Sequence, residues 1–83
     1  MAKVLNKIRT ALQRTFPPPD RIDLRDEDGI IGVVVSSKFK NMDSMDRIDM
    51  VWDVLDKHLS TDEKKQIVIM IAVTPQEEIA HTS

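Results

Sequence analysis

Residues 29–59 contain a strand-like run, a short polar loop and then a helix-like run. This combination limits the possible folds more than any other stretch of the chain. Residues 30–36 read Ile-Ile-Gly-Val-Val-Val-Ser. β-branched side chains suit a pleated, half-buried surface, and Gly29 before the run and the serines at its end mark its limits. The run therefore predicts a strand in the core of a sheet.

The period of the apolar residues then changes to that of a helix. From Ser44 to Leu59 they recur every three or four positions, which places them on one helix face. These residues are Met45, Ile48, Val51, Trp52, Leu55 and Leu59. We expect this face to lie on the sheet. Asp43 or Ser44 is suited to cap the first turn.

The N-terminal part predicts a helix, a break and an edge strand. Residues 2–15 have an amphipathic helical pattern, and the three prolines at 17–19 end it. Residues 21–25 alternate charged and apolar side chains, as in a strand with Ile22 and Leu24 inward. Asp26-Glu27-Asp28-Gly29 predicts a hairpin turn. The alternative is a calcium loop of the helix–loop–helix kind, which has a glycine at its sixth position and acidic ligands at its first and twelfth positions. With Gly29 at the sixth position, Leu24 and Val35 fall at the first and twelfth, so we favour the turn.

The C-terminal part predicts a second strand between two short helices. Ser60-Thr61-Asp62-Glu63 has the form of a capping box, and Thr74-Pro75 is a helix start. Between them, residues 66–73 are apolar on both strand faces, as in a strand covered on two sides. The expected faces are Ile67, Ile69, Ile71 and Val73 on one side and Val68, Met70 and Ala72 on the other. We expect Ile79 and Ala80 to fold over the second face of the sheet.

Together these elements predict an α+β fold in the order α-β-β-α-(short α)-β-(short α). The strand at residues 66–73 follows the strand at residues 30–36 and the helix at residues 44–59. The simplest connection is a right-handed crossover, which places the two strands parallel to each other. We therefore expect a three-stranded mixed sheet with the two long helices on one face. At 83 residues, the chain is expected to be one domain, 1–83.

Composition limits the chemistry and the location. The chain has no cysteine, which removes thiolate ligands, cysteine nucleophiles and disulfides and suits a cytoplasmic protein. Its apolar runs are too short to span a bilayer, so no membrane association is expected. Residues 1–25 carry a net charge of +4 and residues 26–83 a net charge of −6. Only the first helix could therefore attract phosphate, and an ordinary solvated surface is the simpler interpretation of its lysines and arginines.

A family resemblance rests on several short motifs. They are Ser37-Lys38-Phe39, then Arg47, Val51 and Leu55 on the second long helix, and Thr74-Pro75-Gln76-Glu77 after an apolar strand. In this order, over nearly the whole chain, they resemble the BolA family. The resemblance implies a fold like that of class II KH domains. It also implies a role as a small adaptor for monothiol glutaredoxins through a shared iron–sulfur cluster, or a role in transcriptional control.

The sequence departs from that family where the cluster ligands lie. The family usually has a histidine after the arginine that matches Arg47, and here that position is Ile48; its cluster-ligating histidine falls on Gln66. The loop before the core strand can supply histidine or cysteine in the family, whereas here it is acidic and better suited to hard cations. His58 and His81 match neither ligand position. We therefore expect no cofactor and no metal site.

The leading functional hypothesis is a non-enzymatic protein-interaction module, with a monothiol glutaredoxin as one partner class. Arg47, Met50 and Val54 form the candidate partner-binding surface, because they are expected on the side of the helix opposite its core stripe. A flank half-covered by neighbouring residues explains Met50 and Val54 equally well. The oligomeric state is left open.

Two other classes are weaker. A KH-like nucleic-acid-binding or transcription-regulatory protein is the alternative, but the chain has no Gly-x-x-Gly motif. Its acidic helix, with Asp46, Asp49, Asp53 and Asp56, would also repel phosphate. For an enzyme, no nucleophile and base can be paired by spacing, so Asp53, Asp56 and Asp62 are interpreted as solvated acids.

Overall fold

The computed structural model describes the backbone of residues 2–82 and the side chains of residues 4–78. It confirms the expected α+β element order and adds a short 3-10 turn, η1. The elements are α1 (Ala2–Thr15), β1 (Arg21–Asp26), β2 (Ile30–Val35), η1 (Ser37–Phe39), α2 (Ser44–His58), α3 (Thr61–Lys64), β3 (Ile67–Val73) and α4 (Pro75–Thr82).

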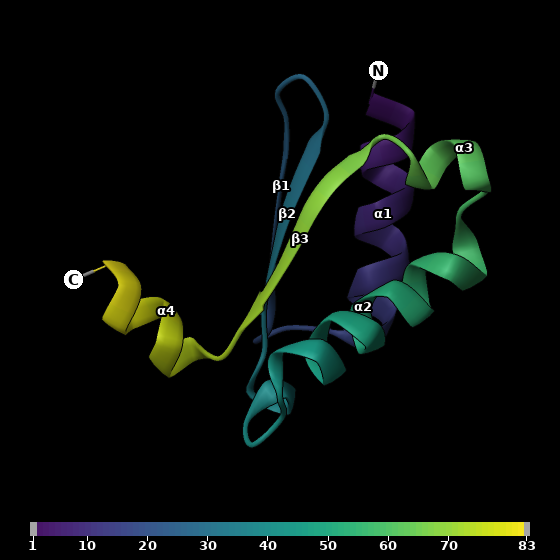
Figure 1. Cartoon of the computed structure of the whole chain (residues 1–83). Helices are drawn as coiled ribbons and strands as arrows, with labels where there is room; N and C mark the ends of the chain where they lie inside the picture. The colour runs from purple at the N-terminus through teal and green to yellow at the C-terminus, as the bar shows by residue number, and fades with distance from the viewer. Residues whose placement is uncertain (1, 83) are drawn as a thin grey trace.

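The three strands form a mixed sheet in the order β1-β2-β3. β1 pairs antiparallel with β2, and β3 pairs parallel with β2, as the crossover through α2 requires. Figure 1 shows α1 and α2 on one face of the sheet and α4 beyond its other face, at the end of β3. The expected sheet, with two long helices on one face, is therefore confirmed.

The core lies between the sheet and the two long helices. The expected stripe of α2 is confirmed at Val51, Leu55 and Leu59, which are buried, while Ile48 and Trp52 are half-buried. Met45 is 72% exposed, so its expected place in the core is wrong. It lies in the first turn of α2, and Met42 in the preceding loop packs against the core instead.

One extra residue in β3 changes which side chains face the core. Ile30 pairs with Ile67, but Ile31 pairs with Ile69, so Val68 has no partner across the ladder. This irregularity turns Ile67 inward and leaves Val68 65% exposed, which reverses the faces expected for these two residues.

The rest of β3 alternates as expected, with Met70 buried and Ile69 and Ile71 exposed. The two exposed isoleucines, at 48% and 40%, show that described side chains do not cover the second face of this strand as expected. The side chains of Ile79 and Ala80, expected to lie over that face, are outside the described residues.

The turn between β1 and β2 is the predicted hairpin. Gly29 has a φ of 123°, and a Cβ atom there would lie 2.2 Å from Cγ2 of Val68. Only glycine satisfies both constraints. Asp28 also has a positive φ, of 54°, which aspartate tolerates better than most residues.

Of the expected side-chain caps, the one before α3 is present and the one at Asp43 before α2 is absent. The capping box before α3 is present, with Ser60 and Glu63 bonded reciprocally. The corresponding start of α2 at Asp43 has no side-chain capping bond.

No helix in the part of the chain that the structure describes is long and apolar enough to cross a membrane.

Candidate partner-binding site

The candidate surface lies where α2 runs beside β3. Arg47, Met50 and Val54 are three and four residues apart, so they share one side of the helix. α2 contacts β3, and Arg47 reaches the backbone of that strand at Ala72. The structure therefore brings the three predicted residues together on the side of α2 that borders the sheet.

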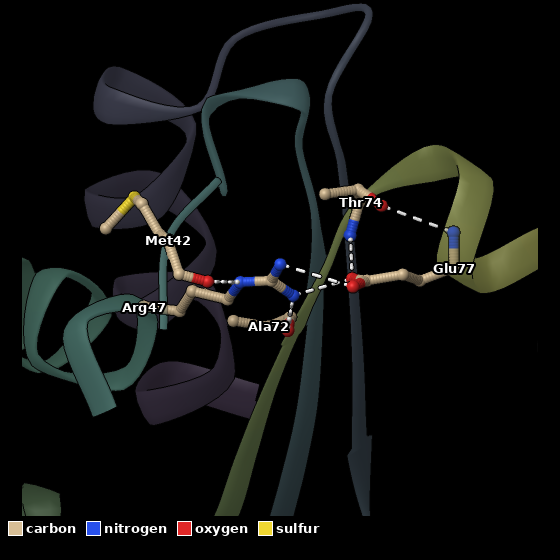
Figure 2. A network of polar contacts seen from close by, with 5 residues as sticks. All are labelled: Met42, Arg47, Ala72, Thr74 and Glu77. Atoms are coloured by element: carbon tan, nitrogen blue, oxygen red, sulfur yellow. Dashed lines mark hydrogen bonds and ion pairs between the residues drawn. The ribbon is translucent and has the colours of Figure 1, made fainter. Parts of the chain in front are cut away.

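Arg47 joins three separate parts of the chain. Its Nε donates to the carbonyl of Met42 at 3.0 Å, and Nη1 donates to the carbonyl of Ala72 at 3.5 Å. The guanidinium also binds both oxygens of Glu77, at 2.6 and 3.2 Å. Figure 2 shows this side chain passing from α2 across β3 to the start of α4. Arg47 therefore holds α4 to the body of the protein.

Glu77 has a second set of bonds that makes this contact rigid. Its Oε1 accepts from the amide of Thr74 at 2.8 Å, and its own amide donates to Oγ1 of Thr74 at 3.2 Å. These bonds confirm the expected cap by Thr74 at the start of α4. The hydrogen bond from Arg47, followed by that from the Thr74 backbone, lowers the pKa of Glu77 to about 2.

The three predicted residues do not stand clear of the core. Met50 and Val54 are half-buried and pack against the core cluster, and the side chain of Arg47 is only 13% exposed. The expectation that they lie opposite the buried stripe is wrong, because the stripe is wide enough to include this flank of α2. Their role in partner binding stays a prediction, and their exposed atoms are what a partner would contact.

Sequence reasoning missed the ion pair between Arg47 and Glu77, which are 30 residues apart. It likewise missed a second contact on α4, where Arg21 of β1 binds the carboxylate of Glu78. The consecutive glutamates thus attach α4 to α2 on one side and to β1 on the other. Only the spacing of Thr74 and Glu77 carried a local signal, that of a capping box.

Two positions that would carry iron–sulfur ligands in the family that this sequence resembles, Gln66 and the turn before β2, lie close together here but have the wrong chemistry. The carbonyl of Gln66 accepts from the amide of Ile30, directly after the hairpin turn, at 2.7 Å. Gln66 and the adjacent acidic turn therefore offer oxygen atoms, whereas iron–sulfur clusters are held by thiolates or imidazoles. These residues do not fit a cluster. Among the described residues, no group of three or more metal-ligating side chains is close enough to hold an ion.

His58 does not change this conclusion. His58 is exposed at the end of α2, beside a shallow depression with Lys7 and Arg14 of α1. Lys7 there binds the carboxylate of Glu63 at 2.8 Å. The side chain of His81 lies outside the described residues.

Asp53, Asp56 and Asp62 are exposed, in agreement with their interpretation as solvated acids, and the other two aspartates of α2, Asp46 and Asp49, are exposed as well. One of them, Asp56, binds Lys64 at 2.8 Å. The candidate surface of Arg47, Met50 and Val54 is half-buried, unlike these exposed aspartates.

Two solved structures are similar to this chain in fold. BolA1 from Arabidopsis thaliana is 21% identical, with a TM-score of 0.71 over 93% of this chain and 98% of that one. The BolA1 protein from Mus musculus is 22% identical, with a TM-score of 0.75 over 100% of this chain and 74% of that one. No protein-family model matches the sequence, and no curated protein matches it. The structural likeness shows that this chain has the BolA fold.

Proposed function

We propose that this chain is a non-enzymatic adaptor of the cytoplasm that binds a protein partner by direct contact. The observation that carries the proposal is the BolA fold in a chain whose ligand positions are occupied by Ile48 and Gln66. A fold associated with partner binding is retained, while the side chains that would hold a shared cluster are replaced. A monothiol glutaredoxin is the partner class that the resemblance implies.

The flank of α2 supports this proposal by its chemistry. Met50 and Val54 are half-buried apolar residues on the same side of α2 as Arg47, whose ion pair with Glu77 lies nearer the start of the helix. Methionine adapts to irregular partner surfaces, and a small apolar center with a polar border is the usual anatomy of an interface. Aspartates on the exposed side of α2 disfavour nucleic acid at the same place.

The test is a binding experiment with an iron chelator present throughout. The purified chain is immobilised and exposed to a monothiol glutaredoxin, and separately to lysate from the native cell. The double variant Met50→Gln, Val54→Thr changes the polarity of the flank with little change of volume. Met45→Gln is the matched control, because Met45 lies on the same helix and is 72% exposed.

We expect the wild-type chain and Met45→Gln to capture the same protein and the double variant to bind it at least about tenfold more weakly. Such a loss corresponds to about 1.4 kcal/mol. Circular dichroism confirms that each variant is folded. Capture of nucleic acid in place of protein, or equal capture by all three chains, would contradict the proposal.

A further inference from the structure

The free edge of β1 has a charge pattern that matches a second copy of itself. Arg21, Asp23, Arg25 and Glu27 are exposed, alternate along the strand and its first turn residue, and change sign at every step. If two such strands run antiparallel with Leu24 opposite Leu24, Arg21 faces Glu27 and Asp23 faces Arg25, in addition to the bonds that Arg21 makes to Asp23 and Glu78 within its own chain. Every one of these pairs joins opposite charges. Directly opposed opposite charges stabilise adjacent strands, and like charges destabilise them.

The backbone of β1 is suited to this register. Nη1 of Arg9 donates to the carbonyl of Ile22 at 3.3 Å from outside the sheet, so Ile22 and, by alternation, Leu24 direct their backbone groups to the free edge. Two copies of Leu24 would then exchange two hydrogen bonds at the twofold axis. Asp23 and Arg25 fall on the neighbouring pairs without mutual backbone bonds, where side chains approach most closely.

The inner side of the edge adds a further complementary pair. In this register, Asp26 of the second copy lies opposite Ile22, beside the guanidinium of Arg9. A hollow of about 520 Å³ extends along the edge, lined by Arg9 and residues of β1 and β2. An approaching strand therefore meets open space and a cation placed for its carboxylate.

The opposite edge of the sheet is closed to such pairing. β3 contains the unpaired Val68 near one end, and irregularities of this kind disrupt an edge. Near its other end, Arg47 covers the carbonyl of Ala72 and binds Glu77 across the strand. Both edges carry an arginine on a carbonyl, Arg9 on Ile22 and Arg47 on Ala72. They differ because β1 pairs regularly along its whole length, and the carbonyl of Ile22 has a second lone pair to accept the amide of Asp26 from a second copy.

We propose that this protein self-associates through antiparallel pairing of β1 with β1 of a second copy, which gives a continuous six-stranded sheet with twofold symmetry. The paired segment has six residues, and small interfaces are weak and transient. The dimer therefore forms at high protein concentration and low salt. This edge lies across the sheet from the flank of α2 that borders β3, so its test is independent of the proposed partner site.

The test measures self-association by sedimentation equilibrium of the full chain at low ionic strength, from roughly 10 µM to 1 mM. Arg25→Asp and Asp23→Arg each oppose like charges across the twofold axis. The double variant Asp23→Arg, Arg25→Asp opposes unlike charges again. Arg14→Asp on α1 makes the same charge change as Arg25→Asp at an exposed position away from β1.

We expect the wild type to dimerise, each single β1 variant to weaken dimerisation by about tenfold or more, and the double variant to recover it. Arg14→Asp should behave as wild type, and added salt should weaken all the dimers. A wild-type chain that stays monomeric over the whole range would overturn the proposal. So would a double variant that is no better than the single ones, or an Arg14→Asp chain that is equally impaired.

Discussion

At the scale of single residues, Arg47 shows why side-chain roles are harder to predict than side-chain positions. Helical spacing placed it correctly on α2 beside Met50 and Val54, but its carbonyl partners and Glu77 come from elements that only the folded chain brings near. The side chain of Arg47 is only 13% exposed and binds three segments of the chain. Its main role is therefore to stabilise the fold. A partner would contact its remaining exposed edge.

The aromatic residues give a stability prediction at the same scale. Phe39 is fully buried and its ring packs 5.4 Å from that of Phe16, whereas Trp52 is only half-buried. Phe39→Ala should therefore cost about 3–5 kcal/mol, the usual cost for a buried aromatic residue, and Trp52→Ala should cost less. Urea denaturation of both variants measures the difference. A larger loss for Trp52→Ala would contradict the packing described here.

At the scale of elements, sequence patterns predicted the order and type of the α-helices and strands, and most of their limits to within about one residue, because each carries its own apolar pattern or cap. The 3-10 turn η1 was not predicted. The extra residue in β3 could not be predicted, since no local signal distinguishes Val68 from its neighbours. The irregularity follows from pairing with β2 beside Gly29, whose missing side chain leaves room for Val68. The ion pairs that attach α4 were unpredictable for the same reason, as both join distant parts of the chain.

The attachment of α4 to α2 predicts a pH dependence. The pKa of Glu77 is about 2 in the folded protein and near its ordinary value of 4.5 when the chain is unfolded. A lowered folded pKa contributes stability that is fully present above about pH 4.5 and is lost as the pH falls toward 2. Glu77→Gln should remove this contribution, so its stability should fall less than that of wild type between these pH values.

Urea denaturation at a series of pH values measures this effect, with Glu27→Gln on the hairpin turn as the matched charge control. The control should follow the wild-type profile. A Glu77→Gln profile parallel to wild type over the whole range would show that the contact with Arg47 and Thr74 does not persist in solution.

At the scale of the whole molecule, the structure separates two surfaces on opposite edges of one sheet. The flank of α2 beside β3 is proposed to bind another protein, and the edge of β1 is proposed to bind a second copy of this chain. The sequence allowed the first surface to be suggested, because Arg47, Met50 and Val54 are neighbours on one helix. It did not show the second, because the charge pattern of β1 becomes meaningful only once β1 is known to have a free edge.

The central claim is that partner binding needs no iron, and the most direct measurement is the visible absorption spectrum of this chain co-purified with a monothiol glutaredoxin. Because Ile48 and Gln66 supply no soft ligand, we predict a colourless complex that survives treatment with an iron chelator. A brown complex with iron–sulfur absorption that the chelator dissociates would contradict the claim.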